Sequence, residues 1–392
     1  MELHNDALHG RLADWLLRKG HTRRTARSLL GGFCRRALEG GIPLWRSTLV
    51  MNTLHPLERA AVLVWRADTD RTEEFRLQHG TENSAQYQNS PIKRVFDGDA
   101  EIRRRLDGDA TLDFPILADI KAEGASDYFV LPVVYGDGTR NAVTFATKAE
   151  GGFSDYCLEE LRHAARMLGP IFELQTMRSI ALNLADTYLG PRTGRRVLDG
   201  AIRRGSGEAI RAVVWMCDLR GFTAMSAGAS PETVIGALND FFDTMAAPVE
   251  RHGGEILKFI GDAMLAIFPL GEGRDISGIC GGALSAAIEA ESAMTRLNAR
   301  RAEAGAGALD FGIALHVGEV TYGNIGAPRR LDFTVIGRAV NLASRIEGLS
   351  APLGRRVLLS ADFARAAGGG FESLGRHALK GIAEPQEIFA PG

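Results

Sequence analysis

Two apolar runs, each interrupted by an aspartate, constrain the fold of this chain more than any other feature. The run Val213–Cys217 leads directly into Asp218, and the runs Ile256–Ile260 and Ala263–Phe268 are separated only by Gly261 and Asp262. Both runs predict strands, and the Gly-Asp pair predicts a two-residue hairpin turn with Asp262 at its tip. A buried carboxylate without a partner is costly, so these positions favour a bound cation or a hydrogen-bond donor. The alternative is that Asp218 only caps a helix and Asp262 only forms the turn.

The order of elements around these runs predicts an α+β fold. A strand, a helix, a strand pair, a helix and a strand follow one another in these segments: Ile210–Cys217, Pro231–Arg251, Glu255–Phe268, Gly278–Arg301 and Leu309–His316. This is the ferredoxin-like order, in which two helices pack on one face of an antiparallel sheet. We also expect a hairpin in the glycine-containing segment Gly318–Gly326, and two short strands at Ala378–Gly381 and Glu387–Phe389.

A third motif combines an amide and a guanidinium. A strand at 331–336 leads into a helix at Gly337, and Asn341 and Arg345 are four residues apart on that helix. Residues at i and i+4 project from the same face, one turn apart. Such a pair can bind the oxygens of a phosphate or an oxyanion. The alternative is an ordinary exposed polar face.

The N-terminal half predicts a smaller α+β module. The expected helices are Leu8–Lys19, Thr25–Glu39, Ser90–Asp107 and Asp119–Gly124. The expected strands are Trp45–Leu54, Ala60–Ala67, Tyr128–Val134 and Asn141–Ala146. Gly136-Asp137-Gly138 joins the last two strands and is a strong hairpin signal. This order resembles a GAF domain over about residues 40–170. The resemblance implies regulation by an unknown small molecule or protein, and a plain dimerisation or targeting module is the alternative.

The segment Ser154–Leu189 predicts one long helix. Leucines recur at seven-residue spacing, with Gln175 in the one missing place: Leu161, Leu168, Leu182 and Leu189. Sustained heptads favour a parallel dimeric coiled coil, and a helix lying on its own domain is the alternative. Gly190–Gly194 then breaks the helix. We therefore divide the chain into N-terminal helices (1–40), a GAF-like domain (41–153), a helical linker (154–200) and a C-terminal domain (201–392).

Composition excludes several classes of protein. The 392 residues are 45% hydrophobic and 24% charged, as in ordinary globular proteins, and a formal net charge of −2 gives no basic footprint for nucleic acid. No apolar run approaches the roughly 20 residues of a membrane span. The scattered cysteines form neither a C-x-x-C pair nor a disulfide framework, which favours a reducing cytoplasm: Cys34, Cys157, Cys217 and Cys280. We expect His55, His79 and Cys34 to be packing or surface residues rather than ligands.

Three motifs together resemble the catalytic domain of class III nucleotidyl cyclases: Cys217–Thr223, Lys258–Asp262 and Thr334–Arg345. The resemblance implies two Mg²⁺ or Mn²⁺ ions per active site, bound by Asp218, Asp262 and the carbonyl of Leu219. It also implies that Gly221, Phe222 and Thr223 contact the nucleotide, and that Lys258 and Thr334 read its purine. Asn341 and Arg345 would steady the ribose and the transition-state phosphate, and Lys380 would contact the triphosphate. Two-metal chemistry suits attack of the ribose 3′-hydroxyl on the α-phosphorus, with pyrophosphate leaving.

The residues Lys258 and Thr334 resemble those of an adenylate cyclase subgroup, some of whose members respond to bicarbonate. A lysine only donates and suits the ring nitrogens of adenine, and a threonine hydroxyl can accept from the 6-amino group. The expected substrate is therefore ATP, and the alternatives are a guanylate cyclase or a catalytically weak nucleotide-binding signalling module. Because the family shares each site between two chains, the resemblance further implies a homodimer with two sites related by a two-fold axis.

Overall fold

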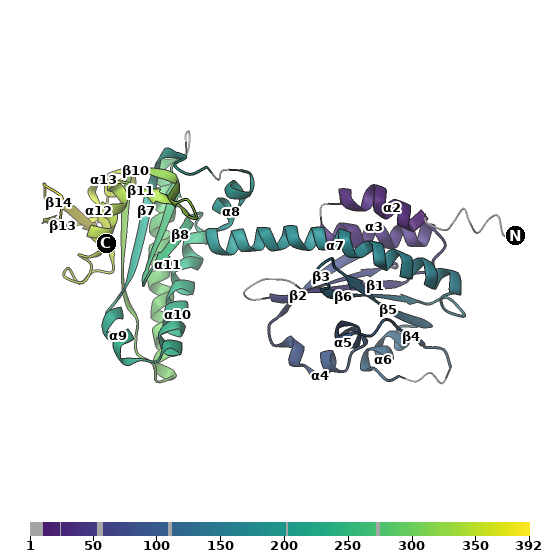
Figure 1. The fold of residues 1–392 in the computed structure, drawn as a ribbon. Helices are drawn as coiled ribbons and strands as arrows, with labels where there is room; N and C mark the ends of the chain where they lie inside the picture. Colours follow the sequence, from purple (N-terminus) through teal and green to yellow (C-terminus); the bar gives the residue numbers. More distant parts are fainter. Residues whose placement is uncertain (1–10, 24, 53–57, 109–111, 201–202, 272–274) are drawn as a thin grey trace. The chain divides into compact units, whose positions relative to one another are not determined.

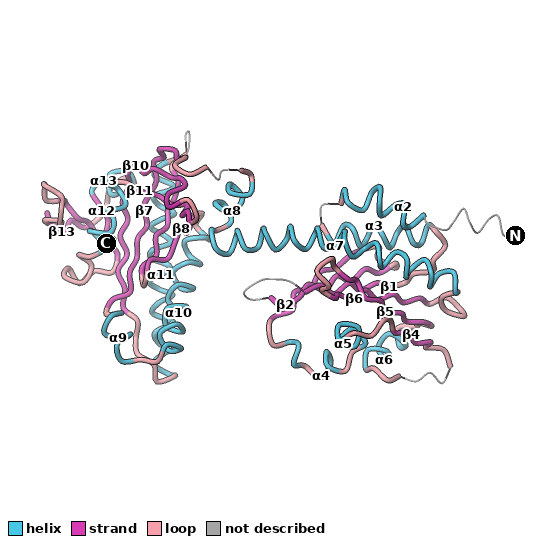
Figure 2. Tube along the Cα trace, viewed as in Figure 1, coloured by secondary structure: helices cyan, strands magenta, loops and turns pink. Residues whose placement is uncertain are grey.

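The computed structural model describes residues 11–23, 25–52, 58–108, 112–200, 203–271 and 275–392. Its contacts divide the chain into two units, Met1–Leu184 and Ala185–Gly392 (Figure 1). This division lies inside the linker that the sequence analysis placed at 154–200. Each unit is built on one sheet (Figure 2). Within the described residues, no helix combines the length and the apolar character that crossing a membrane requires.

The first unit contains a six-stranded sheet with the order β3-β2-β1-β6-β5-β4, in which all neighbouring strands are antiparallel. Its strands are β1 (Arg46–Asn52), β2 (Glu58–Arg66), β3 (Arg71–Gln78), β4 (Ile102–Arg105), β5 (Asp127–Val134) and β6 (Arg140–Thr147). Its helices are α2 (Arg11–Lys19), η1 (Gly20–Thr22), α3 (Ala26–Glu39), η2 (Thr81–Asn83), α4 (Ala85–Gln88), α5 (Pro91–Asp97), α6 (Pro115–Ala122) and α7 (Asp155–Leu189).

Two apolar cores hold this sheet between its helices (Figure 1). On one face, α2, α3 and the first half of α7 pack on the sheet through residues such as Leu16, Phe33 and Leu161. On the other face, α5 and α6 contribute Val95 and Leu117 to a second core. The N-terminal helices therefore share a core with the sheet from which the sequence analysis had separated them.

Several of the predicted elements are confirmed. The second N-terminal helix begins after Thr25, whose side chain accepts a hydrogen bond from the Ser28 backbone in a capping box. The four predicted strands form the pair β1–β2 and the hairpin β5–β6, both antiparallel. The start of the first predicted helix (8–10), the end of the strand predicted at Trp45–Leu54, and His55 lie outside the described residues.

The helix predicted at Ser90–Asp107 is wrong in its second half. The helix α5 ends at Asp97, Gly98 adopts a φ of +133°, and β4 then pairs with β5. Ile102 packs into the core below α5 and α6, and Arg103 forms an ion pair of 2.7 Å with the buried Asp127. The charge of this segment belongs to an edge strand rather than to an exposed helix. The charged edge strand β3 was not predicted at all.

The heptad positions of α7 do not behave alike. Leu161 and Leu168 are fully buried in the core of their own unit, and the buried Gln175 donates a hydrogen bond to the Arg23 carbonyl at 2.6 Å. This half of the repeat therefore follows the alternative of a helix lying on its own domain. Leu182 is exposed and Leu189 is half-buried, so dimerisation through the second half stays a prediction.

The second unit contains an eight-stranded sheet with the order β13-β14-β12-β10-β7-β9-β8, and β11 pairs with β10 beside this path. Its elements are α8 (Pro191–Leu198), β7 (Gly207–Arg220), α9 (Phe222–Gly228), α10 (Pro231–Arg251), β8 (Glu255–Ile260), β9 (Ala263–Pro269), α11 (Ile276–Glu303), β10 (Asp310–Ala327), β11 (Arg330–Ile336), α12 (Arg338–Glu347), β12 (Val357–Ser360), α13 (Ala361–Ala366), β13 (Glu372–His377) and β14 (Gln386–Ala390). The four strands β10-β7-β9-β8 have the predicted ferredoxin-like arrangement, and α10 and α11 share one core on one face of the sheet. The other face carries β11 and α12.

The hairpin predicted at Gly318–Gly326 is wrong, because β10 runs unbroken through this segment and turns only after Ala327. The glycines of this segment do not form a turn; they allow neighbouring segments to pack closely against β10. A Cβ at Gly318 would meet the Cβ of Ala339 on α12, and one at Gly323 would clash with the Ser206 carbonyl. The strand predicted at Ala378–Gly381 is also displaced: this segment is a turn, and the strand before it is β13.

Candidate functional site

The two aspartates of the sequence motifs lie together at one end of the sheet. Asp218 is near the end of β7, where it pairs with Ala263 of β9. Asp262 occupies the β8–β9 turn behind Gly261, whose φ of +66° suits the hairpin that the sequence predicts. Burial, together with the negative charge of the neighbouring Asp262, raises the pKa of Asp218 to about 6. The two carboxylates therefore repel each other in the absence of a cation.

This pair fits a divalent cation with oxygen ligands. The Oδ1 atom of Asp218 is buried and has no hydrogen-bond partner in the described part of the chain. An orphaned carboxylate oxygen beside a second carboxylate is a donor set that Mg²⁺ or Mn²⁺ prefers. No cluster of three or more His, Cys, Asp or Glu side chains among the described residues is arranged to hold a metal ion. A metal site here would therefore rest on the two aspartates and backbone or nucleotide oxygens.

A third carboxylate, Glu347, was missed by the sequence analysis. It is buried at the end of α12, and a Cβ at Gly312 would clash with Glu347 Oε1 and Ser350 Oγ. Gly312 lies directly opposite Asp218 in the β7–β10 ladder, and side chains at opposed positions extend from the same face about 5 Å apart. Glu347 thus faces the aspartate pair, and burial and the charge of Asp218 raise the pKa of Glu347 to about 7.

The exposed face of α12 carries the predicted amide and guanidinium. Asn341 and Arg345 are both exposed, whereas Ala339, Ala343 and Ile346 bury the opposite face. Neither polar side chain has a hydrogen bond or an ion pair to another described residue of its own chain. The prediction that both project from one face is confirmed. Their contact with a nucleotide stays a prediction.

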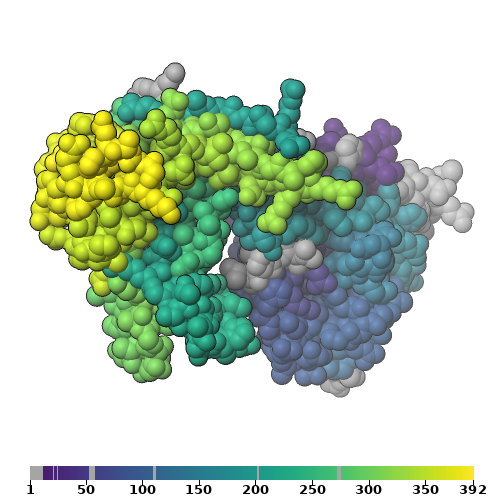
Figure 3. Space-filling view, turned by 60° about the vertical axis from the view of Figure 1, so that its left-hand side comes forward, coloured from purple at the N-terminus to yellow at the C-terminus, as the bar shows by residue number. Residues whose placement is uncertain are grey.

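The remaining predicted contacts lie at the end of β7, at the start of α9 and in the turn after β13. Gly221 and Thr223 are exposed at the start of α9, and Phe222 packs partly against the apolar core below α9. The Leu219 side chain is buried in that core, which leaves only its backbone available as a ligand. Lys380 is exposed in the turn after β13, within the C-terminal segment that forms part of the surface in yellow in Figure 3.

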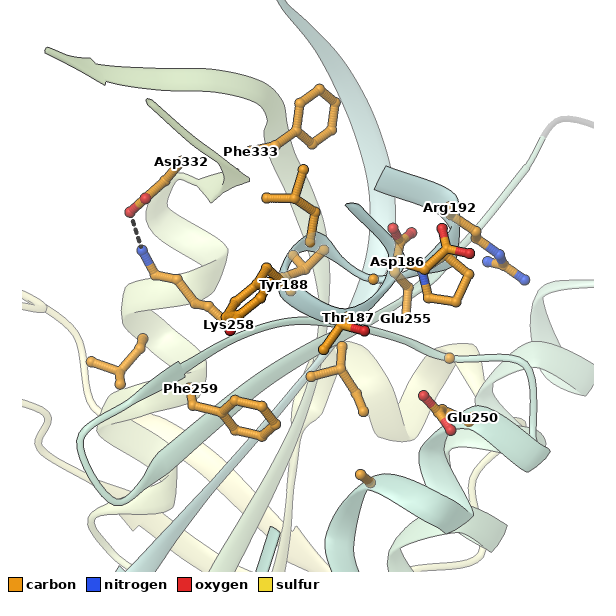
Figure 4. Close-up of a pocket in the computed structure, with 18 of the residues that line it drawn as sticks. Asp186, Thr187, Tyr188, Arg192, Glu250, Glu255, Lys258, Phe259, Asp332 and Phe333 are labelled. Carbon is orange, nitrogen blue, oxygen red and sulfur yellow. Dashed lines mark hydrogen bonds and ion pairs between the residues drawn. The ribbon is translucent and has the colours of Figure 1, made fainter. Parts of the chain in front are cut away.

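Lys258 and Thr334, the residues that the resemblance assigns to the purine, lie on β8 and β11. Lys258 lines a cavity of about 1040 Å³ and donates a hydrogen bond to Asp332 Oδ2 at 3.1 Å (Figure 4). Thr334 is almost completely buried, and its hydroxyl has no partner among the described residues. Phe259, the neighbour of Lys258, packs on Phe242 of α10 and so fixes the outer strand β8.

The cavity is lined by only part of the predicted site. Its walls come from residues 186–192, from β8 and the end of α10, and from β11. They include Lys258 but neither of the aspartates Asp218 and Asp262, and neither Asn341 nor Arg345 of α12. Within one chain, the two aspartates, the residues predicted to read the purine and the residues predicted to bind phosphate therefore do not line one common cavity.

Comparison with known proteins defines the class of this unit. Residues 208–388 match the family model of the adenylate and guanylate cyclase catalytic domain. The match covers most of the C-terminal unit and includes the three motifs of the sequence analysis.

Two adenylate cyclases are among the curated relatives of the chain. The chain is 37% identical over 168 residues to an adenylate cyclase of Anabaena cylindrica, which covers 42% of this chain and 32% of the relative. It is 32% identical over 145 residues to adenylate cyclase 1 of Rhizobium meliloti (strain 1021), which covers 36% of this chain and 21% of the relative. The chain thus spans a third or less of the length of these two curated relatives.

A solved structure shows the same fold. A bacterial light-regulated adenylyl cyclase is similar with a TM-score of 0.50 and 23% identity, covering 58% of this chain and 65% of that one. At this level of identity the likeness concerns the fold alone.

Proposed function

We propose that the chain is an adenylate cyclase that converts ATP to 3′,5′-cyclic AMP and pyrophosphate at sites shared by two copies of the chain. The observation that carries this proposal is the pair of mutually repelling carboxylates, Asp218 and Asp262, in a domain of the cyclase family. The similarity to adenylate cyclases supports ATP as the substrate.

The carboxylates of Asp218 and Asp262 and the Leu219 carbonyl would hold two Mg²⁺ or Mn²⁺ ions. Such ions lower the pKa of the ribose 3′-hydroxyl and neutralise charge on the phosphate oxygens. The protein groups set the geometry: the strand end and the hairpin turn hold both aspartates on rigid backbone. Gly221, Phe222 and Thr223 follow directly and would border the bound nucleotide.

The purine would be read by Lys258 and Thr334. Lys258 donates to an adenine ring nitrogen, and the Thr334 hydroxyl accepts from the 6-amino group. The unpaired buried hydroxyl of Thr334 supports this role, because such a group favours a ligand that satisfies it. This donor–acceptor pattern matches adenine better than guanine.

The phosphates and ribose would be bound by Asn341, Arg345 and Lys380. Fixed donors stabilise charge that develops on the phosphoryl oxygens in the transition state. All three side chains are exposed, so they are free to meet a nucleotide bound to the aspartates of a second copy. If one chain supplies the aspartates and the other supplies these donors, a head-to-tail homodimer has two equivalent sites.

The first unit would be a GAF-like regulatory domain that responds to a small molecule or a protein. It has its own sheet and its own two cores, and α7 continues from it into the first residues of the second unit. A continuous helix can transmit a change in one domain to the next. The four cysteines of the chain are free and buried, which supports a cytoplasmic location.

Turnover by the purified full chain tests the function. ATP and GTP are supplied separately with Mg²⁺ or Mn²⁺, and cyclic nucleotide and pyrophosphate are quantified. We expect cyclic AMP and pyrophosphate in equal amounts, and no product after a chelator is added. Preference for GTP would make the protein a guanylate cyclase, and nucleotide binding without product would make it a signalling module.

A further inference from the structure

One ion pair next to the proposed purine site has no role in the mechanism above. Lys258 Nζ on β8 lies 3.1 Å from Asp332 Oδ2 on β11, and both side chains are partly exposed at the cavity (Figure 4). The two residues are 74 positions apart in the sequence. The contact therefore depends on the fold of this unit, in which β8 and β11 lie next to each other.

The carboxylate of Asp332 lies on the same face as the proposed adenine acceptor. Asp332 and Thr334 are two positions apart on β11, so their side chains extend from the same side of the strand, roughly 7 Å apart. Lys258 reaches across to Asp332, and this holds its ammonium group at a residue two positions from Thr334, whose buried hydroxyl is unpaired within the described residues. A third residue thus fixes the proposed donor near the strand segment that supplies the proposed acceptor.

A lysine needs such a partner more than most residues do. Its long, flexible side chain has a large rotamer entropy, which is lost when the ammonium is fixed on a ligand. A partner that holds the ammonium in place beforehand reduces this cost of binding. Thr334 is uncharged and cannot hold the lysine electrostatically.

We propose that Asp332 is a positioning residue for Lys258, whose carboxylate holds the ammonium beside Thr334 so that the pair recognises adenine. This proposal rests on the proposed function and deepens it. Paired with Lys258, the carboxylate of Asp332 is also less available to the N1–H and 2-amino donors of guanine. The ion pair therefore favours adenine in two ways: it orders the donor for adenine and occupies an acceptor for guanine.

The ion pair contributes little to stability, because water and salt screen the attraction between partly exposed charges. Asp332→Asn, which keeps the shape and removes the charge, should therefore leave the melting temperature close to that of the wild type. Asp332→Glu restores a carboxylate on a longer stem. The matched control is Asp362→Asn, which removes a similarly exposed aspartate that pairs with Arg365 on α13.

The experiment measures binding and turnover on the full chain in parallel. Binding of 3′-deoxy-ATP, 3′-deoxy-GTP and inorganic tripolyphosphate is measured by calorimetry with Mg²⁺, since these ligands lack the attacking hydroxyl. We expect Asp332→Asn to weaken 3′-deoxy-ATP binding about 10-fold and tripolyphosphate binding less than about twofold. The KM for ATP should rise about 10-fold with kcat within about twofold, since the lost contact acts in the ground state and the transition state alike.

The variants separate the possible outcomes. Recovery of ATP binding in Asp332→Glu, and no change in Asp362→Asn, support a positioning role. Unchanged 3′-deoxy-ATP binding and an unchanged preference over 3′-deoxy-GTP in a folded Asp332→Asn overturn it. Equal weakening of tripolyphosphate binding would overturn it as well. A wild type that binds 3′-deoxy-ATP without making cyclic AMP would refute the proposed function, while the binding data would still decide the role of Asp332.

Discussion

Two groups of polar residues in the second unit differ in the partners that their own chain provides for them. Asp218 and Asp262 are close neighbours at a strand end, and burial and mutual charge hold the pKa of Asp218 well above its ordinary value. Asn341, Arg345 and Lys380 are exposed, and their side chains form no hydrogen bond or ion pair with another residue in the described part of the chain. The first group has too much negative charge for its surroundings, and the second has donors without acceptors. The aspartates lack a cation and the donors lack acceptor oxygens, and a metal-bound nucleoside triphosphate would supply both.

The largest expected effect is the loss of one carboxylate. Asp218→Ala or Asp262→Ala should each lower the rate of cyclic AMP formation by about 10³-fold or more, because the pair acts as a unit. Removing one carboxylate also removes the repulsion, so the melting temperature of the metal-free protein should not fall. Rates and thermal melting of both variants are compared with Asp362→Ala, which lies on α13 and should keep full activity. Residual activity above a few per cent in either variant would contradict the two-metal assignment.

The next prediction tests whether the two groups meet across a dimer. Asp218→Ala and Arg345→Ala should each be inactive alone, since both sites of each homodimer are damaged. A mixed dimer places both changes in one site and leaves the other site intact, so activity should recover to about half of wild type per mixed dimer. The variants are co-expressed with different affinity tags, and the doubly purified species is assayed.

Mixed dimers that form but stay at the background of the single variants would show that each site lies within one chain. The matched control combines Asp218→Ala with Asp262→Ala. These two residues belong to the same group, so the mixed dimer would have one damaged carboxylate in every site and should remain inactive.

A smaller effect is expected when only the base-reading residues change. Lys258→Glu together with Thr334→Cys should lower kcat/KM for ATP by about 10- to 100-fold and raise the relative use of GTP, because the donor at the purine edge becomes an acceptor. Competition between the two nucleotides in one reaction measures the change. Unchanged use of ATP by a folded double variant would show that these positions do not read the base.

The parts of the site that could be predicted from sequence follow local rules. The Gly261-Asp262 turn follows from a two-residue gap between apolar runs, and the shared face of Asn341 and Arg345 follows from helical spacing. Both depend on neighbours within a few residues. These elements were therefore found correctly without any knowledge of the tertiary fold.

The parts that sequence reasoning missed depend on contacts between distant segments. Gly323 suggests a turn by itself, yet it permits close approach of the Ser206 backbone. The pairing of Lys258 with Asp332 requires β8 and β11 to be neighbours, and Glu347 reaches the aspartates only because Gly312 leaves room for it. In the first unit, charged edge strands such as β4 lack the apolar alternation that identifies a strand.

The smallest predicted effect concerns Glu347 and the pH dependence of stability. Its pKa in the folded state is about 7, above the ordinary value of 4.5, so the folded state binds this proton more tightly than the unfolded state does. The stabilisation is fully present below about pH 4.5 and is lost as the pH rises through about 7. Asp218, whose folded pKa is about 6, acts in the same direction.

Glu347→Gln isolates this contribution from the other titrating groups. Urea denaturation of the metal-free wild type and variant is compared from pH 4.5 to pH 8. The two should be similarly stable at pH 4.5, and the variant should be the more stable at pH 8, because the buried charge opposite Asp218 is gone. Added Mn²⁺ should then stabilise the wild type more than the variant, since a bound cation offsets that charge. A difference in stability that does not change with pH would show that the charge of Glu347 is not under the influence of the aspartate pair.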